Sequence, residues 1–391
     1  MHNAHIAMVG IPAISHVLPS LEIIRELVAR GHRVTYANDP AQPAVADAIR
    51  GTGAELVPYR STLPVADNDW PDDPIAASEL FLDDAVSVLS QIAPYYDAQP
   101  ADLYLQDIAG YAARVLAESQ GRPLVQLSPA YVAWKGYEEE VGAYLKGLPG
   151  ASEYHAKFAA WLASTPATTK DPDAFSGRPP RCVATVPRAM QPHADRVDES
   201  VVTFVGPCFG TRAEQGTWTR PDGVDNVLLI SLGSAYTRQP DFYRRCVSAY
   251  GDLPGWHVVL QIGEYVDIAE LGPLPANVEA HAWVPQLAIL TQADAFVTHA
   301  GMGGCAEGLY TATPMIAVPQ AVDQPANADR LVELGVARRL DSATATPADL
   351  REALRELTAD PDVRARCADL AKRARAEGGE KRAADVVESL L

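Results

Sequence analysis

The sequence is poor in cysteine, and the cysteines it has are not spaced as ligands or as pairs. They are five in number, Cys182, Cys208, Cys246, Cys305 and Cys367. No C-x-x-C pair and no interleaved histidine spacing occurs, so neither a structural zinc site nor a disulfide framework is predicted. We therefore expect reduced thiols and a cytoplasmic protein.

Long apolar runs and positive charge are also scarce. No apolar run reaches the length of a membrane span, and the opening MHNAHIAMVGIPA lacks the basic region and apolar stretch of a signal peptide. Lys and Arg number 32 against 50 Asp and Glu, which gives a formal net charge of −18. Because an acidic surface repels phosphate backbones and anionic lipid, neither nucleic acid nor a membrane is expected as a partner.

The length and composition indicate a globular protein of two domains. At 391 residues the chain exceeds the size at which one hydrophobic core keeps growing. Hydrophobic residues make up 48% and charged residues 21%, and the 31 prolines are scattered rather than clustered. Such a composition is typical of folded proteins and excludes disorder as the main state of the chain.

Short apolar runs alternate with helical patterns along the chain. The run Ile6 to Val9 precedes a helical pattern that begins near Pro19, and the run Val34 to Ala37 follows it. Similar units recur near 103–127 and again over 227–318. This alternation predicts the α/β class, with two Rossmann-like, doubly wound domains whose parallel sheets are covered by helices.

Domain limits follow from the shifts in composition. We predict an N-terminal domain over 1–205, with a helical insertion near 136–180, and a turn-rich linker over 206–225. A C-terminal domain is predicted over 226–375. The last helix, 376–391, is the candidate to pack back on the N-terminal domain. The two domains are expected to face each other, with ligands between the carboxyl ends of their strands.

One block of the second half carries residues suited to binding a nucleotide. It reads WVPQLAILTQADAFVTHAGMGGCAEGLYTATPMIAVPQAVDQPAN and begins at Trp283. Ala295–Thr298 is predicted as a buried strand, followed by His299 and a helix. The glycines that let a backbone approach a ligand closely are Gly301, Gly303 and Gly304. The N–H groups at a helix N-terminus bind anions, so a phosphate site is predicted.

These glycines alone leave more than one function open. The stretch from Gly301 to Ala306 satisfies G-x-G-x-x-A, and Asp323 follows at the distance of the dinucleotide fingerprint. An NAD-dependent oxidoreductase is therefore a rival on the glycines, and a non-catalytic nucleotide-sugar-binding protein is a third class. A serine hydrolase is disfavoured because no G-x-S-x-G occurs.

The whole block resembles the nucleotide-sugar signature of the glycosyltransferase family that includes plant secondary-product and bacterial macrolide enzymes. The matching residues are Trp283, Pro285, Gln286, His299, Gly301, Glu307, Pro314, Pro319, Asp323, Gln324 and Asn327. The segments HVLPSLEIIRELVARGHRVTYA, AWKGYEEEV and SLGSAYTRQPDFYRRC are similar to macrolide glycosyltransferases of the oleandomycin type, so the resemblance covers nearly the full chain. It implies a GT-B fold and transfer of a sugar from a nucleotide donor to a small hydroxylated acceptor.

The resemblance implies a role for each donor residue. The predicted donor-binding set is Ser234, Trp283, Gln286, His299, Gly301, Gly303, Gly304, Glu307, Asp323 and Gln324. A flat ring suits a flat base and a carboxylate suits a diol, so Trp283 and Gln286 are assigned to the base and Glu307 to the ribose. His299 and the amides after it are assigned to the diphosphate, and the Asp-Gln pair to the sugar. Ser234 either contacts a phosphate or caps a helix.

The donor expected from the resemblance is a UDP-sugar, with UDP-glucose as the first choice. A dTDP-sugar is the alternative, because uracil and thymine present the same pairing edge. Where the plant signature has Asn and Ser, this chain has Gly303 and Gly304, which leaves phosphate binding to backbone amides. The Asp171-Pro172-Asp173 stretch has the D-x-D form of a metal pair but lies in a proline-rich loop. No metal and no further cofactor is expected.

The acceptor expected from the resemblance is a macrolide or another bulky polyketide or phenolic alcohol. Ile14 and Ser15 replace the His-Gly that usually precedes the catalytic histidine of the macrolide group, and they are predicted to shape the acceptor pocket. Trp134 is a candidate pocket wall, with an ordinary aromatic helix as its alternative. Donor and acceptor are the predicted partners, and a homodimer is left open.

The predicted catalytic pair is His16 as general base and Asp107 as its hydrogen-bond partner. His16 is placed in the loop before the helix at Pro19, and Asp107 after the strand Leu103–Leu105, so both follow strands at one edge of a sheet. Each matches the family's catalytic pair. An imidazole oriented by a carboxylate removes a hydroxyl proton near neutral pH. Direct attack of the acceptor oxygen on the anomeric carbon is then predicted to invert configuration.

Overall fold

The computed structural model describes residues 3–65, 70–71, 73–210, 212 and 215–391. Their contacts divide the chain into two compact units. The first unit comprises Met1–Val186, His193–Gly210 and Gly378–Leu391, and the second comprises Pro187–Pro192 and Thr211–Glu377. Of the predicted linker 206–225, residues 211, 213 and 214 lie outside the described residues.

The first unit is built on a parallel sheet. Its strands are β1 (His5–Val9), β2 (Arg33–Asn38), β3 (Glu55–Pro58), β4 (Leu103–Asp107), β5 (Leu124–Ser128), β6 (Cys182–Ala184) and β7 (Val202–Phe204). Its helices are α1 (Ile14–Ala29), α2 (Pro43–Arg50), α3 (Pro74–Ala98), α4 (Tyr111–Gln120), α5 (Ala143–Lys146), α6 (Ala151–Ser164), α7 (Pro172–Gly177) and α14 (Gly379–Glu388). The described strands form a seven-stranded sheet in the order β3-β2-β1-β4-β5-β6-β7. The first strand is therefore central, between β2 and β4.

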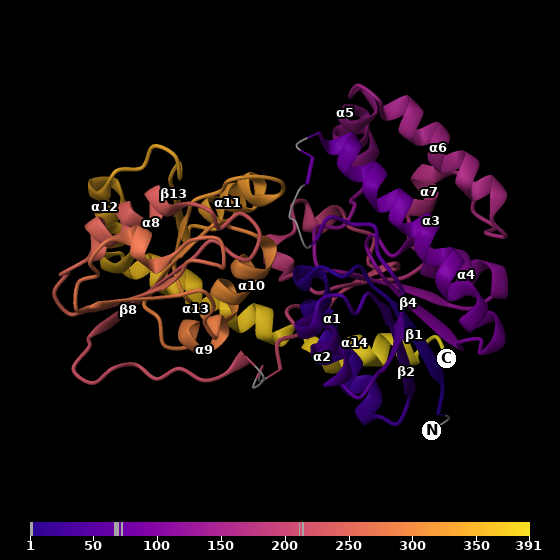
Figure 1. Cartoon of the computed structure of the whole chain (residues 1–391), viewed down its shortest axis with the longest axis horizontal. Helices are drawn as coiled ribbons and strands as arrows, with labels where there is room; N and C mark the ends of the chain where they lie inside the picture. The colour runs from indigo at the N-terminus through magenta and orange to yellow at the C-terminus, as the bar shows by residue number, and fades with distance from the viewer. Residues whose placement is uncertain (1–2, 66–69, 72, 211, 213–214) are drawn as a thin grey trace. The chain divides into compact units, whose positions relative to one another are not determined.

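Alternation along β1 divides the core of this unit between the two faces of the sheet. Ile6 and Met8 belong to a cluster with residues of α1, α2 and α14. Ala7 and Val9 belong to a second cluster with residues of α3 and α4. Successive side chains of a strand point to opposite faces, so these two clusters mark its two helical layers. Figure 1 shows α14, in yellow, beside α1.

The first helix begins earlier than its sequence pattern predicts. The carbonyl of Ala13 accepts the N–H of His16 at 2.9 Å and that of Val17 at 3.0 Å, so the chain is already helical from Ile14. The prediction that His16 lies in a loop before the Pro19 helix is therefore wrong. Proline marks a helix start because it lacks an N–H, but near the N-terminus it removes only one helical hydrogen bond, and α1 accommodates it.

The segment between β5 and β6 is the predicted helical insertion. It contains α5, α6 and α7. Phe158, Trp161 and Phe175 pack with Leu82 of α3 and Val115 of α4 in a cluster of their own. The insertion is thereby fixed to the helical layer formed by α3 and α4.

The second unit repeats the architecture. Its strands are β8 (Asn226–Ser231), β9 (Trp256–Gln261), β10 (Val278–His281), β11 (Ala295–Thr298), β12 (Met315–Ala317) and β13 (Ala337–Arg339). Its helices are α8 (Pro240–Tyr250), α9 (Gln286–Leu290), α10 (Met302–Tyr310), α11 (Gln324–Glu333), α12 (Pro347–Ala359) and α13 (Pro361–Ala376). The described strands form a six-stranded parallel sheet in the order β10-β9-β8-β11-β12-β13. The predicted fold class, two parallel-sheet α/β domains, is confirmed.

The end of the chain returns to the first unit. Thr346 caps α12 with its side chain, and Asp349 completes a capping box, as the sequence indicates. After α13 the chain leaves the second unit, and α14 buries Ala383, Ala384 and Val387 in the core cluster of α1. Among the described residues, no helix combines the length and apolar composition needed to cross a bilayer.

Candidate functional site

The first unit brings the two predicted catalytic residues together. Nδ1 of His16 lies 3.0 Å from Oδ2 and 3.1 Å from Oδ1 of Asp107. The Asp107 side chain is 2% exposed, whereas that of His16 is 24% exposed. The carboxylate is therefore enclosed by protein, and the imidazole remains accessible to a ligand.

The hydrogen bond selects one tautomer of His16. An ionised carboxylate only accepts hydrogen bonds, so the Nδ1 nitrogen that faces Asp107 carries the proton. In the neutral ring the lone pair then lies on Nε2. This arrangement can accept a proton at Nε2 and can stabilise the imidazolium that results.

The two neighbouring strands β1 and β4 hold the pair in place. Val9 pairs with Gln106, the residue before Asp107, so the ends of both strands lie side by side. Asp107 is itself the last residue of β4, which extends two residues beyond the predicted strand Leu103–Leu105. The chain then turns sharply at Gly110, where a Cβ would meet the carbonyl oxygen of Val9 at 2.5 Å. Only glycine permits this close approach.

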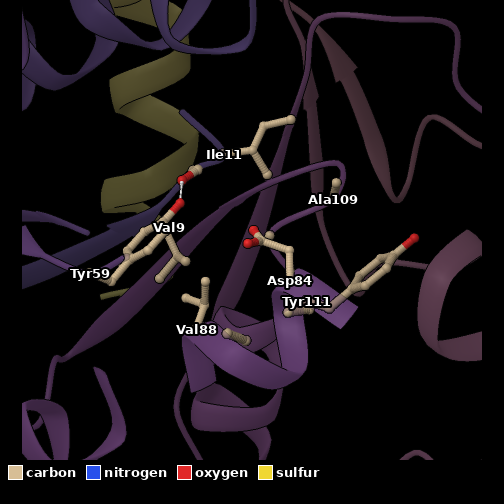
Figure 2. Close-up of a pocket in the computed structure, with 11 residues that line it drawn as sticks. Val9, Ile11, Tyr59, Asp84, Val88, Ala109 and Tyr111 are labelled. Carbon is tan, nitrogen blue, oxygen red and sulfur yellow. Dashed lines mark hydrogen bonds between the residues drawn. The ribbon is translucent and has the colours of Figure 1, made fainter. Parts of the chain in front are cut away.

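A small pocket lies beside these strand ends (Figure 2). It is lined by Val9, Gly10, Ile11, Tyr59, Asp84, Ala85, Val88, Ala109, Gly110, Tyr111 and Ala112. Figure 2 shows the side chain of Asp84 among the residues that line this pocket, between Ile11 and Val88. Burial raises the pKa of this carboxyl, and hydrogen bonds from Thr62 and Ser61 oppose the shift.

Sequence reasoning did not single out Asp84. It lies on α3 with Leu82, Ala85 and Val88, which are buried. The sequence signal that could have identified it is an acidic residue within the apolar face of an amphipathic helix. Tyr59, whose hydroxyl donates to the carbonyl of Gly10 at 2.7 Å, carried no such signal.

The predicted acceptor residues occupy different surroundings. Ile14 and Ser15 are the first two residues of α1, where Ile14 packs against the core and Ser15 is exposed. Trp134 lies in the loop after β5, and its Nε1 donates to Glu140 at 3.0 Å. The stretch around it is a loop and a π-helical turn rather than an ordinary helix, so the plain-helix alternative is wrong. Neither Ile14, Ser15 nor Trp134 lines the pocket of Figure 2.

In the second unit, His299 directly follows β11 and is enclosed by two glycines. A Cβ at Gly233 would meet Cε1 of His299 at 2.6 Å, and one at Gly301 would meet Nε2 at 2.4 Å. Burial lowers the pKa of His299 to about 4, and the backbone of Ser231 acts in the opposite direction. The ring is neutral at neutral pH and can donate one hydrogen bond to an anion.

The helix after His299 begins at Met302, whereas the sequence pattern predicts a helix only after Gly304. Gly303 and Gly304 therefore lie in the first turn of α10, where N–H groups have no partner within the helix. A Cβ at Gly303 would meet nothing within 4 Å, whereas one at Gly304 would lie 3.0 Å from the hydroxyl of Thr298. Gly303 borders open space, and Gly304 allows α10 to pack closely on β11.

The carboxylate of Glu307 is buried between protein partners. Its side chain lies on α10, and the residue is 4% exposed. Oε2 accepts a hydrogen bond from Gln286 at 2.6 Å, and Oε1 accepts one from the guanidinium of Arg212. Trp283, by contrast, is 53% exposed, although it is a large aromatic side chain. The sequence did not predict a role for Arg212, because its partner Glu307 lies 95 residues further along the chain.

Asp323 and Gln324 form the start of α11. Asp323 is exposed, and its Oδ2 accepts a hydrogen bond from Asn327 at 2.7 Å. Gln324 is buried, and its Oε1 accepts from the backbone N–H groups of Gln320 at 2.8 Å and Ala321 at 3.2 Å.

Ser234 is exposed in the turn after β8. Since α8 begins only at Pro240 and its N-cap residue is Gln239, Ser234 caps no helix here, and that alternative is wrong.

The D-x-D stretch has structural partners. The side chain of Asp171 caps α7 by accepting the N–H of Ala174 at 2.7 Å. Asp173 forms an ion pair with Lys146 at 2.6 Å. Within the part of the chain that the structure describes, no three His, Cys, Asp or Glu side chains gather as a candidate metal site.

Comparison with known proteins identifies the family. The oleandomycin glycosyltransferase of Streptomyces antibioticus is 56% identical over 395 residues, which cover 99% of this chain and 91% of that protein. This chain belongs to the oleandomycin-glycosyltransferase-like family 1 glycosyltransferases. Residues 251–390 also match the model described as erythromycin biosynthesis protein CIII-like, C-terminal domain. Membership of this family removes the oxidoreductase alternative left open by the glycine pattern.

Other relatives also match over nearly the full length of this chain. The NDP-glycosyltransferase YjiC of Bacillus licheniformis is 34% identical, over 100% of this chain and 98% of that protein. The crystal structure of the glycotransferase of kitacinnamycin is 51% identical, covers 99% of both chains and superposes with a TM-score of 0.90. The chain is thus a glycosyltransferase with the GT-B fold over its full described length.

Proposed function

We propose that this glycosyltransferase transfers glucose from UDP-glucose to a hydroxyl of a macrolide or a similar bulky natural product, with inversion at the anomeric carbon. The observation that carries the mechanism is the hydrogen bond between Nδ1 of His16 and the buried Asp107. It orients Nε2 as the base for the acceptor hydroxyl. The acceptor oxygen then attacks the anomeric carbon as the nucleoside diphosphate leaves from the opposite face.

The donor assignment rests on the second unit. An exposed Trp283 offers a ring for the base, and the neutral His299 with the first amides of α10 offers hydrogen-bond donors for the diphosphate. Glu307 is assigned to the ribose, although Arg212 and Gln286 hold its oxygens without the donor. Ribose binding therefore requires Glu307 to share or exchange one of these partners.

The acceptor class rests on similarity. The relative named for oleandomycin is 56% identical, and the segments quoted from the sequence resemble macrolide glycosyltransferases. Reduced thiols suit a cytoplasmic enzyme, since all five cysteines are buried and none is paired. Catalysis is proposed to need neither a metal nor a further cofactor.

The test is turnover with defined substrates. The purified protein is incubated with UDP-glucose and a panel of macrolides and phenolic alcohols, and UDP release and the mass of the glucoside are measured. The anomeric coupling constant of the product by NMR should show a β-glucoside from the α-linked donor. A product with retained configuration would contradict the mechanism, and turnover confined to non-macrolide alcohols would contradict the acceptor class.

A dTDP-sugar is the second candidate donor. Uracil and thymine present the same edge to Gln286, and the Bacillus licheniformis relative is named for nucleoside diphosphates in general. A panel of UDP- and dTDP-sugars with one acceptor separates the two. Binding of both without any turnover would instead favour a non-catalytic sugar-nucleotide-binding protein.

A further inference from the structure

Two loops of the second unit contain non-glycine residues in left-handed backbone conformation. Ala300, between β11 and α10, has φ = 61°, and Val322, between β12 and α11, has φ = 57°. Such residues are strained and persist where the surrounding structure holds them. β11 and β12 are neighbours in the sheet, so the two loops leave adjacent strands.

One buried side chain connects these loops. Asn327 lies on α11 and is fully buried. Its Nδ2 donates to the carbonyl of Ala300 at 3.0 Å and to Oδ2 of Asp323 at 2.7 Å. An amide nitrogen has two protons, so both are used. The opposite orientation of the amide would set its oxygen against two other acceptors, and the partners therefore fix the orientation.

We propose that Asn327 is a positioning residue that fixes the diphosphate loop, residues 299–304, and Asp323, assigned to the sugar, relative to each other. This inference rests on the proposed function, in which the diphosphate meets His299 and the amides after it. Ala300 is the residue at which the chain turns from β11 into α10. Its carbonyl is held by Asn327 and its N–H by the hydroxyl of Thr298 at 3.2 Å. Holding Ala300 directs the following amides.

The shared amide has a consequence for recognition. The same Nδ2 group holds Ala300 and Asp323. When the diphosphate of a donor binds the diphosphate loop, Asp323 is therefore already in position to bind the sugar. The full nucleotide sugar, which uses both loops, should therefore depend on Asn327 more strongly than the nucleoside diphosphate, which uses one.

The first test is Asn327→Ala, with Asn277→Ala as the matched control. Asn277 also donates two hydrogen bonds from Nδ2, to the carbonyls of Tyr250 and Trp256 at 3.1 Å each, but near β9 and β10. Calorimetric titration with UDP and kinetics with UDP-glucose are measured for both. Asn327→Ala should weaken UDP about tenfold and raise the KM for UDP-glucose further. Asn277→Ala should change neither.

The second test is rescue by glycine. Ala300→Gly removes the cost of the left-handed conformation, so the loop no longer needs to be held. The double variant Ala300→Gly with Asn327→Ala should bind UDP within about threefold of Ala300→Gly alone, while its KM for UDP-glucose stays raised. If the cavity left by Asn327→Ala destabilises the protein, the isosteric Asn327→Asp is the second variant. It also loses both donated hydrogen bonds and should weaken UDP in the same way.

Amide hydrogen exchange of the ligand-free protein separates this inference from the donor assignment. Exchange over residues 300–305 should accelerate about tenfold in Asn327→Ala and remain unchanged in Asn277→Ala. If the wild-type protein binds no nucleoside diphosphate but Asn327→Ala shows this acceleration, the positioning role stands and the proposed donor is removed. Unchanged exchange together with unchanged UDP affinity in Asn327→Ala, or no rescue by Ala300→Gly, overturns the inference.

Discussion

Nδ1 of His16 lies 3.0 Å from Oδ2 of Asp107, although 91 residues separate the two along the chain. Adjacent parallel strands account for this contact, because Val9 of β1 pairs with Gln106 of β4. The histidine is presented from the first turn of α1 and the carboxylate from the end of β4. The dyad is thus a product of sheet topology rather than of local sequence.

Replacing His16 by Ala should lower kcat by about 10²–10⁴-fold and leave UDP binding nearly intact, because the base is lost while the donor residues of the second unit remain. Steady-state kinetics and calorimetry provide the two readouts. His155→Ala, which removes another accessible histidine of the first unit, is the control and should keep its activity. Full activity in His16→Ala would exclude this residue as the base.

Asp107→Asn should lower kcat in the same direction. The amide can turn its NH₂ group toward Nδ1, which then accepts a hydrogen bond and places the proton on Nε2. In that tautomer the nitrogen assigned to the acceptor is no longer basic. Comparison of kcat with the melting temperature tests this directly. A loss of activity that follows only a loss of folded protein would contradict the proposed tautomer control.

Glu307→Ala should weaken UDP binding by about 1–3 kcal/mol, through loss of hydrogen bonds to a charged group. It should also lower the free energy of unfolding, because the buried partners Arg212 and Gln286 lose their acceptor. Calorimetry and urea denaturation measure the two effects separately. Unchanged UDP affinity in a folded Glu307→Ala protein would remove the ribose assignment.

The stability of the ligand-free protein should depend on pH through His299. Its pKa is lowered from 6.5 to about 4 by burial, so between these values the unfolded chain binds the proton and the folded protein does not. The free energy of unfolding should therefore fall by up to about 3 kcal/mol as the pH drops from 6.5 toward 4. His299→Gln should lack this contribution, and identical pH profiles for both proteins would contradict it.

Val322→Gly should raise the free energy of unfolding by about 0.5–1 kcal/mol. Val322 is 79% exposed and has φ = 57°, so glycine relieves the left-handed strain and removes little packing. Val332→Gly is the control, because Val332 is also exposed but lies within α11, where glycine is less favourable than valine. Urea denaturation of both variants should give shifts of opposite sign, and a loss of stability in both would contradict the strain at Val322.

Local patterns predicted the elements whose residues carry one clear signal. β11 has the predicted bounds Ala295–Thr298, since a continuous apolar run becomes a strand buried along its whole length. The start of α1 was mispredicted because Pro19 imitates a helix N-terminus. β10 was missed, since Val278–His281 has only two buried residues in alternation.

The candidate site was predictable where a residue acts by its own chemistry. His16, Asp107 and the residues after β11 follow strands that the sequence marks. Arg212 could not be found in this way, because its contact with Glu307 depends on how the chain folds and on no local pattern. The link from Asn327 to Ala300 likewise depends on two loops of adjacent strands, although Asn327 was visible as part of the family signature.

The return of α14 to the first unit determines which unit can complete its core first during translation. The ribosome makes β1 and α1 early, yet their core cluster also needs Ala383, Ala384 and Val387, which emerge after all of the second unit. A nascent chain can therefore complete its second unit while the first still exposes apolar surface along α1. Chaperone binding on the ribosome is expected to concentrate on the part of the protein that was translated first, and a stop codon before α14 should harm that part most.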